Sequence, residues 1–473
     1  MKISVREDCR RAALSLGSFI GWNFTVIELA RQSLSASYAI TLFPRVKMLF
    51  LASQLFFLLL TIVLMTIFDV EGIICRPIMR VIPAVFMGEG AIAMAMCRYS
   101  TASAFAVVAG FGAATGAVAM LTALLKLRTR DRLKVIGVSL PAAALIFILG
   151  GLAAPAVLQS ETSRITVGAI LAAAVVLSIR FEKFSGSSTG IINHFDEKTA
   201  AYVLKKLPWE LFAFFPLCTG YFICLELSGG FAQENAVEDF DYLRLGGFII
   251  FALAAVTVGF LAKPHNAGAL FAAGSIVTAA GVLVLSVSTL TMFEKGMYTF
   301  FAYIGFALFM CSVYLIISGL ATSRLHPLFY ATSAFFVYIL SQLTASFVTN
   351  HIHASREKSV YIAAVLGVVG LIALPVISKG LAQKGYTAQA IERRRSIRRE
   401  IAAMAEEYDL SGRDSIILEL LAVERCPKDE LRYNMFLSPE KIEKHFKKIE
   451  NHSGRTVEDI VAELWEKYDD VKA

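Results

Sequence analysis

Residues 102–125 read ASAFAVVAGFGAATGAVAMLTALL, a run without a single charged side chain. An apolar stretch longer than about 18 residues is typical of a helix that crosses a membrane, because it spans the hydrocarbon layer. Comparable stretches recur along a chain that is 56% hydrophobic and only 18% charged, whereas soluble proteins average about 25% charge. The composition therefore predicts an all-α, polytopic membrane helix bundle.

About twelve spans are expected, in two groups of about six that are separated by the polar residues 181–206. This arrangement resembles the major facilitator architecture, in which two six-helix halves surround a central cavity. The predicted spans are residues 12–34, 46–68, 77–97, 102–125, 135–158, 163–181, 207–230, 244–262, 266–289, 296–320, 327–350 and 359–380.

Basic side chains gather in alternate loops, most densely in residues 126–134, while the loop after the seventh span is acidic. Cytoplasmic loops of membrane proteins carry an excess of Lys and Arg. Arg45 and Lys47 go against this pattern, but the other loops agree. The pattern predicts a multi-pass protein of the bacterial inner membrane with both termini in the cytoplasm.

A basic linker, residues 384–404, joins the membrane domain (1–383) to a charged tail (405–473). Its run at 391–400, IERRRSIRRE, can anchor the chain on anionic lipid headgroups, at about 1 kcal/mol for each basic residue. It can also transmit a conformational change to the tail, or contact DNA phosphates. The sequence leaves these three readings open.

The tail predicts a bundle of three or four short helices. Ser411 is a suitable N-cap, and Asp414 stands at the N3 position of a weak capping box. Ser438 caps a later helix whose first residue is Pro439, and Gly454 ends it. The inward positions of that helix are Ile442, Phe446 and Ile449, and a last apolar stripe is formed by Val457, Ile460, Val461, Leu464 and Trp465.

Residues 410–464 resemble the LuxR-type helix-turn-helix domain. The matching positions are Leu410, Ser411, Arg413, Leu418 to Ala422, Lys428, Leu437, Ser438, Ile442, His445, Ile449 and Gly454. The resemblance implies that the helix after Ser438 enters the major groove of DNA and that the last helix pairs two protomers into a homodimer. The DNA contacts carried over from the family are Lys441, Lys444, His445, Lys447 and Lys448.

Two acids inside the predicted spans, Glu28 and Glu89, are candidates for a ligand-binding or proton-carrying role. The alternative, that they form hydrogen bonds between helices, has the stronger support. Glu226 is expected to reach water at the end of its span. The chain contains no nucleophile elbow, P-loop or zinc-protease motif, and no Cys/His spacing typical of a metal site. We therefore expect neither an enzyme nor a cofactor.

These features together predict a membrane-anchored one-component transcriptional regulator. The membrane domain would sense an unknown small molecule or a membrane state, and the tail would bind promoter DNA. The competing interpretation is a secondary transporter of the major-facilitator type whose tail is regulatory or only contacts protein partners. The bilayer is a partner in both.

Overall fold

The computed structural model describes part of the chain, and every regular element in that part is a helix. The described residues are 2–67, 77–127, 129–153, 165–171, 209–234, 240–263, 266–285, 291–322, 327–351, 356–383, 388–423, 426, 428–435 and 437–469. Two compact units emerge, a membrane unit and a second unit that contains the C-terminal residues Leu381–Ala473.

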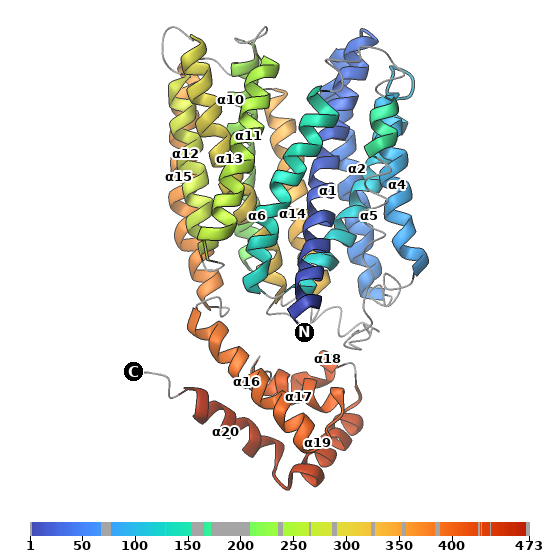
Figure 1. Ribbon diagram of the computed structural model, residues 1–473, viewed down its shortest axis with the longest axis vertical. Helices are drawn as coiled ribbons and strands as arrows, with labels where there is room; N and C mark the ends of the chain where they lie inside the picture. The colour runs from blue at the N-terminus through green and yellow to red at the C-terminus, as the bar shows by residue number, and fades with distance from the viewer. Residues whose placement is uncertain are drawn as a thin grey trace. The chain divides into compact units, whose positions relative to one another are not determined.

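The membrane unit consists of long apolar helices (Figure 1). The first half contains α1 (Lys2–Ala36), α2 (Phe43–Ile67), α4 (Pro77–Ala95), α5 (Ala102–Lys126) and α6 (Thr129–Phe147), which continues as the π-helical η2 (Ile148–Ala153). The second half contains α10 (Trp209–Glu234), α11 (Phe240–Leu261), α12 (Ala267–Val284), α13 (Met292–Thr322), α14 (Pro327–Thr349) and α15 (Arg356–Gln383).

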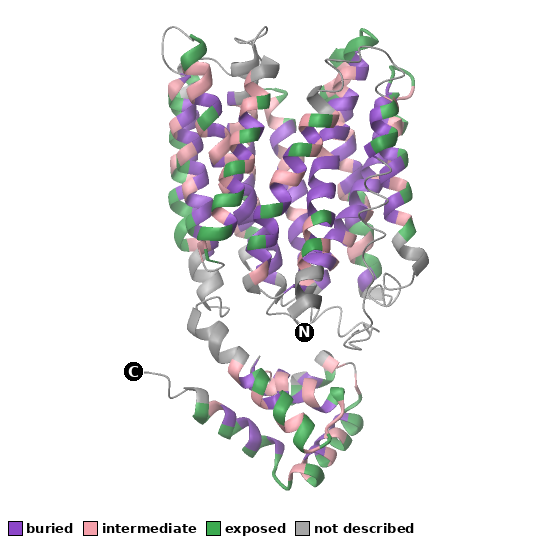
Figure 2. Cartoon of the chain, in the orientation of Figure 1, coloured by how far each residue is buried: buried purple, intermediate pink, exposed green. Residues whose placement is uncertain are grey.

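Ten described helices are long and apolar enough to cross a membrane, and α4 adds a shorter apolar stretch, Val81–Ala95. The predicted all-helical, polytopic bundle is therefore confirmed. Of the predicted span 163–181, residues 165–171 are described and helical, while the rest of that span and the polar residues 181–206 lie outside the described residues. Many large apolar side chains on α2 and α15 are exposed, as a lipid-facing surface requires (Figure 2).

Glycines allow the helices of the membrane unit to approach closely, as is common where helices pack in lipid. A Cβ on Gly17 would lie 2.9 Å from the carbonyl oxygen of Ser139, and one on Gly21 would lie 3.1 Å from the Cα of Ala143. Residue numbers therefore rise together along α1 and α6, so these helices run parallel. We call the end of the unit where α1 begins the proximal end, and the opposite end the distal end.

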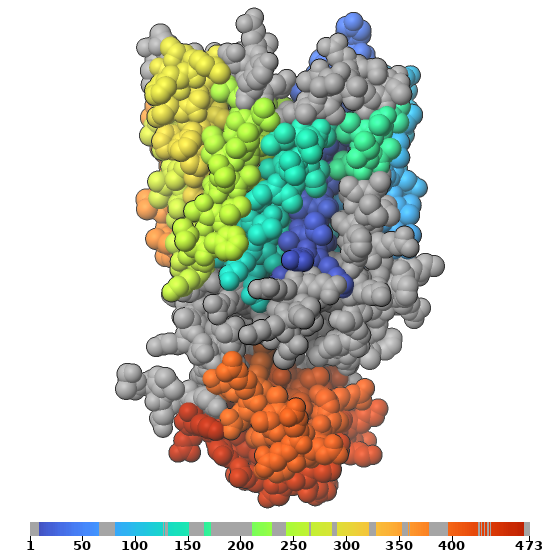
Figure 3. Space-filling view, viewed as in Figure 1, coloured from blue at the N-terminus to red at the C-terminus, as the bar shows by residue number. Residues whose placement is uncertain are grey.

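The two halves meet where α6 crosses α11. A Cβ on Gly137 of α6 would lie 2.5 Å from the Cα of Gly259 on α11, so the two backbones touch without side chains between them. The two helices lie side by side on one face of the space-filling view (Figure 3). Any larger side chain at this crossing would push the halves apart.

The C-terminal unit is a bundle of short helices. They are α16 (Ala388–Glu407), α17 (Gly412–Ala422), η4 (Lys428–Glu430), α18 (Leu431–Met435), α19 (Pro439–Ser453) and α20 (Val457–Asp469). The predicted caps are confirmed: Ser411 and Asp414 form a capping box, Ser438 accepts a hydrogen bond from the backbone N–H of Lys441, and Gly454 ends α19 with a φ of 68°. The predicted inward residues Ile442, Phe446 and Ile449 are buried.

The apolar stripe of α20 packs within this unit. Val457, Ile460 and Leu464 are buried, and the indole N–H of Trp465 donates to the carbonyl oxygen of Ala422 at 2.9 Å. These side chains are already covered by the same chain, so they do not offer a free face to a second protomer. The packing of α20 therefore gives no support to the expected homodimer through the last helix.

Candidate functional site

A buried ion-pair network joins the two halves near the distal end of the membrane unit. Glu28 of α1 is only 5% exposed. Its Oε1 accepts hydrogen bonds from Arg31 (Nε at 3.0 Å, Nη2 at 2.6 Å) and from the Gln32 amide at 3.2 Å. Its Oε2 accepts from Nη2 of Arg244, on α11, at 2.9 Å. One carboxylate of the first half is thus shared between two guanidinium groups, one from each half.

Helical spacing explains why these side chains converge. Phe24, Glu28 and Arg31 are four and three residues apart, so they form one stripe along α1. Arg244 and Phe248 of α11 are four residues apart and so lie on one side of that helix. Helix α11 runs antiparallel to α1. The charged residues of both stripes therefore lie at the distal end, and the rings lie towards the middle of the bundle.

Aromatic rings line the inner side of this network. The guanidinium of Arg244 lies 5.3 Å from the centre of the Phe147 ring, within the range of a cation–π contact. The ring of Phe24 lies 5.9 Å from that of Phe248 and 6.2 Å from those of Phe147 and Phe306. The π-helical η2 packs beside them, since a Cβ on Gly150 would lie 3.0 Å from Thr25; π-helical turns occur frequently at functional sites.

A second ion pair joins the halves at the same end. Lys47, near the start of α2, donates to Oε1 of Glu226 on α10 at 2.8 Å. The hydroxyl groups of Ser346 and Thr349, both on α14, donate to the same carboxylate at 3.0 and 2.9 Å. We expected Glu226 to reach water; its side chain is 24% exposed, and its carboxylate is also bonded on several sides.

A different contact joins the halves at the proximal end. Arg132 lies in the first turn of α6 and is 3% exposed. Its Nη1 donates to the carbonyl oxygen of Ser318, near the end of α13, at 2.7 Å. Its other nitrogens donate to the carbonyl oxygens of Leu127 and Leu125 at 3.0 and 2.9 Å. Polar contacts therefore link the two halves at both ends of the unit.

Of the two acids expected to form a ligand or proton site, the structure places only Glu28 in a polar network. Glu89 is exposed on α4, and no ion pair or hydrogen bond of its side chain is found within the described part of the chain. Composition could not single out Arg244 and Lys47 as partners, because the acids they bind on the other half lie 216 and 179 positions away in sequence. Among the described residues, no His/Cys/Asp/Glu cluster could hold a metal ion.

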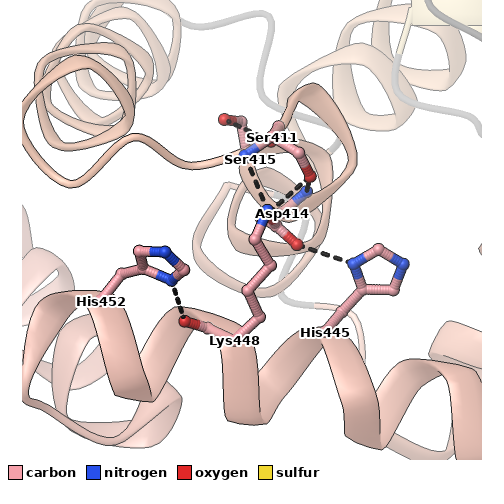
Figure 4. A network of polar contacts seen from close by, with 6 residues as sticks. All are labelled: Ser411, Asp414, Ser415, His445, Lys448 and His452. Carbon is pink, nitrogen blue, oxygen red and sulfur yellow. Dashed lines mark hydrogen bonds and ion pairs between the residues drawn. The ribbon is translucent and has the colours of Figure 1, made fainter.

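A polar network also holds the C-terminal unit together (Figure 4). The carboxylate of Asp414 is fully buried and accepts from the backbone N–H of Ser411 at 2.8 Å, and also from the Ser411 hydroxyl. His445 Nδ1 lies 2.7 Å from Oδ1, and Lys448 Nζ lies 3.2 Å from Oδ2. Burial opposes ionisation of Asp414, but the hydrogen bonds from Ser411, His445 and Lys448 outweigh it and lower the pKa of this carboxyl.

The five side chains expected to contact DNA divide into two groups. Lys441, Lys444 and Lys447 are exposed on α19. His445 and Lys448 instead point to Asp414 and join α19 to the start of α17. These two side chains are part of the internal framework of the unit.

No protein-family model matches the chain, and no curated protein matches it. Two solved structures are similar in fold. The human organic anion transporter MFSD10 (TETRAN) has a TM-score of 0.57 at 13% identity, covering 80% of this chain and 99% of its own. The proton:xylose symporter XylE, bound to 6-bromo-6-deoxy-D-glucose, has a TM-score of 0.54 at 13% identity, covering 79% and 95%. The chain has a major-facilitator-like fold.

This finding corrects the prediction of a LuxR-type transcriptional regulator. In the two similarities above, 80% and 79% of this chain match nearly the whole length of two transporters. The residues that carried the LuxR resemblance are caps such as Ser438 and core positions such as Ile442, which any small bundle of amphipathic helices needs. They indicate the helical framework of the tail and not what it binds. The prediction of a DNA-binding, transcription-regulating protein is therefore wrong.

Proposed function

We propose that this protein is a secondary transporter of the major-facilitator type that carries a small helical unit at its C-terminus. The observation that supports it is a fold shared with two transporters over 99% and 95% of their lengths. Neither of these neighbours is an enzyme, and we propose no catalytic activity. From the loop charges, we propose that both termini lie in the cytoplasm of a bacterial cell. From the shared fold, we propose that the substrate is a small solute.

Transport by such a fold requires the two halves to rock about a site between them, so that the ends of the unit open alternately. The contacts between the halves fit this requirement. Glu28–Arg244 and Lys47–Glu226 hold the distal end closed, and the bond from Arg132 to the Ser318 carbonyl holds the proximal end. Each set of bonds would have to break while the other persists. These ion pairs can break and form again, because each carboxylate keeps hydrogen-bond donors from its own half when the other half moves away.

Uptake by purified protein in liposomes tests the proposal. Candidate solutes of several classes, including sugars and organic anions, are offered with and without a pH gradient, and empty liposomes give the background. We expect saturable uptake of at least one class. Glu28→Gln should reduce that uptake strongly, because it weakens the network that joins the halves, while Glu89→Gln serves as the matched control. If no class enters above background under any gradient, the transport proposal fails.

A further inference from the structure

The network around Glu28 has the chemistry of a binding site for a carboxylate. Its two oxygens are taken by guanidinium groups from opposite halves, Arg31 on Oε1 and Arg244 on Oε2. The planar fork of a guanidinium matches a carboxylate better than it matches most other groups. In a site this well buried the attraction is far less screened than in water. Glu28 therefore shows where an incoming carboxylate would be held.

We propose that Arg244 binds the carboxylate of a ring-bearing organic anion, and that Glu28 occupies this position when no ligand is bound. This inference deepens the proposed transport function by naming a substrate class. The ligand exchanges with Glu28 at the Arg244 guanidinium. Glu28 is not left without donors when this happens, since Arg31 and Gln32 from its own helix still reach Oε1.

The aromatic side of the network suits the rest of such a ligand. Phe24, Tyr303 and Phe306 belong to one continuous group of rings together with Phe248, which lies 5.1 Å from the Tyr303 ring. These three rings are each partly exposed, although they pack on other rings. Ligand sites commonly pair an apolar, aromatic lining with a few charged groups that orient the ligand. An aromatic carboxylate has a charged group for the guanidinium and a ring for the aromatic lining.

Binding in this manner would also affect the contact between the halves. Arg244 belongs to the second half and Glu28 to the first, so a ligand that takes Arg244 removes one of the two ion pairs at the distal end. A ligand shifts an equilibrium between two states when it binds one of them better. The carboxylate of the ligand would thus favour opening of the distal end, whereas a neutral analogue would not.

The test is equilibrium binding to the purified full-length protein, by calorimetry, with benzoate as the probe. Benzamide is its neutral isostere, and acetate is a carboxylate without a ring. We expect benzoate to bind at least tenfold more tightly than either. Arg244→Gln should weaken benzoate binding at least tenfold and leave benzamide unchanged. Arg45→Gln is the matched control, because Arg45 is an exposed cation near the same end of the unit.

Glu28→Gln provides the sharpest outcome, because it removes the internal competitor. Benzoate should bind this variant more tightly than it binds the original protein, even though uptake falls. Arg244→Lys keeps the charge but loses the fork, so it should weaken benzoate binding to an intermediate extent; it also serves if Arg244→Gln does not fold.

The inference is overturned if benzoate binds no better than benzamide, if Arg244→Gln and Arg244→Lys leave benzoate binding unchanged, or if Glu28→Gln weakens it. The two proposals fail separately. Uptake of a neutral solute without benzoate binding would refute only the carboxylate site. Benzoate binding as expected, without uptake of any solute, would refute the transport proposal alone.

Discussion

Replacing Lys47 by Gln should open the distal end of the membrane unit by a measurable amount. Lys47 Nζ lies 2.8 Å from Glu226, and the two side chains are 28% and 24% exposed. Exposed pairs contribute about 0–1 kcal/mol and breaking buried pairs costs about 3–5 kcal/mol, so this half-buried pair should contribute about 1.5 kcal/mol. Since about 1.4 kcal/mol is a tenfold change in an equilibrium, the open population should rise roughly tenfold. Glu226 then keeps only Ser346 and Thr349, from its own half.

Double electron–electron resonance can measure this population. Nitroxide labels are attached at Tyr38→Cys and His351→Cys in a background without native cysteines, because both residues are exposed just beyond distal helix ends, in different halves. Lys47→Gln should transfer population from the short to the long distance, and the exposed Arg45→Gln should not. If the distance distribution of Lys47→Gln equals that of the control, the pair does not hold the halves together and the reasoning is refuted.

Further outcomes follow from close packing and from the buried acid of the tail. Gly137→Val should prevent the contact with Gly259 and abolish recovery of folded, monodisperse protein, whereas Gly246→Ala, with nothing within 4 Å, should behave normally in size-exclusion chromatography. Asp414→Asn should lower the opening free energy of α17 and α19 by about 2–4 kcal/mol in amide hydrogen exchange, against less than about 0.5 kcal/mol for the exposed Glu443→Gln. Because the folded state lowers the pKa of Asp414, this stabilisation is present above the unfolded pKa of about 4 and is lost as the pH falls through the folded value, so protection should drop only in acid.

The bundle itself could be predicted because lipid imposes one demand on every span. A helix in hydrocarbon must be apolar along its whole length and must satisfy its backbone internally. That demand is local, so runs such as Ala102–Leu125 reveal it directly. The number of runs and the polar stretch in the middle of the chain then suggested two halves, and the similarity to two transporters agrees with this.

The partners inside the bundle could not be predicted, because they are set by the packing of the halves. Glu28 was recognised as unusual from its position in a span, but Arg244 lies 216 positions away. In the sequence, Lys47 stands out only as an exception to the loop-charge rule. Its partner Glu226, 179 positions away, now explains the exception: the cation stands there to bind an acid of the other half.

In the tail, too, the partners of charged residues could not be predicted from the sequence. A row of basic residues on α19 suggested a surface for DNA, since cations on a short helix are usually read as facing solvent. Asp414 alters that reading, because a fully buried carboxylate needs donors and takes them from His445 and Lys448, 31 and 34 positions further on. Glu28 needs donors for the same reason and takes them from Arg31 and Arg244. In both units the acid in an apolar setting is the primary feature, and the placement of the nearby basic side chains follows from it. A cluster of basic residues in a sequence is therefore weak support for an external anionic partner. The buried acids of the same fold must first be paired with the basic side chains that they need.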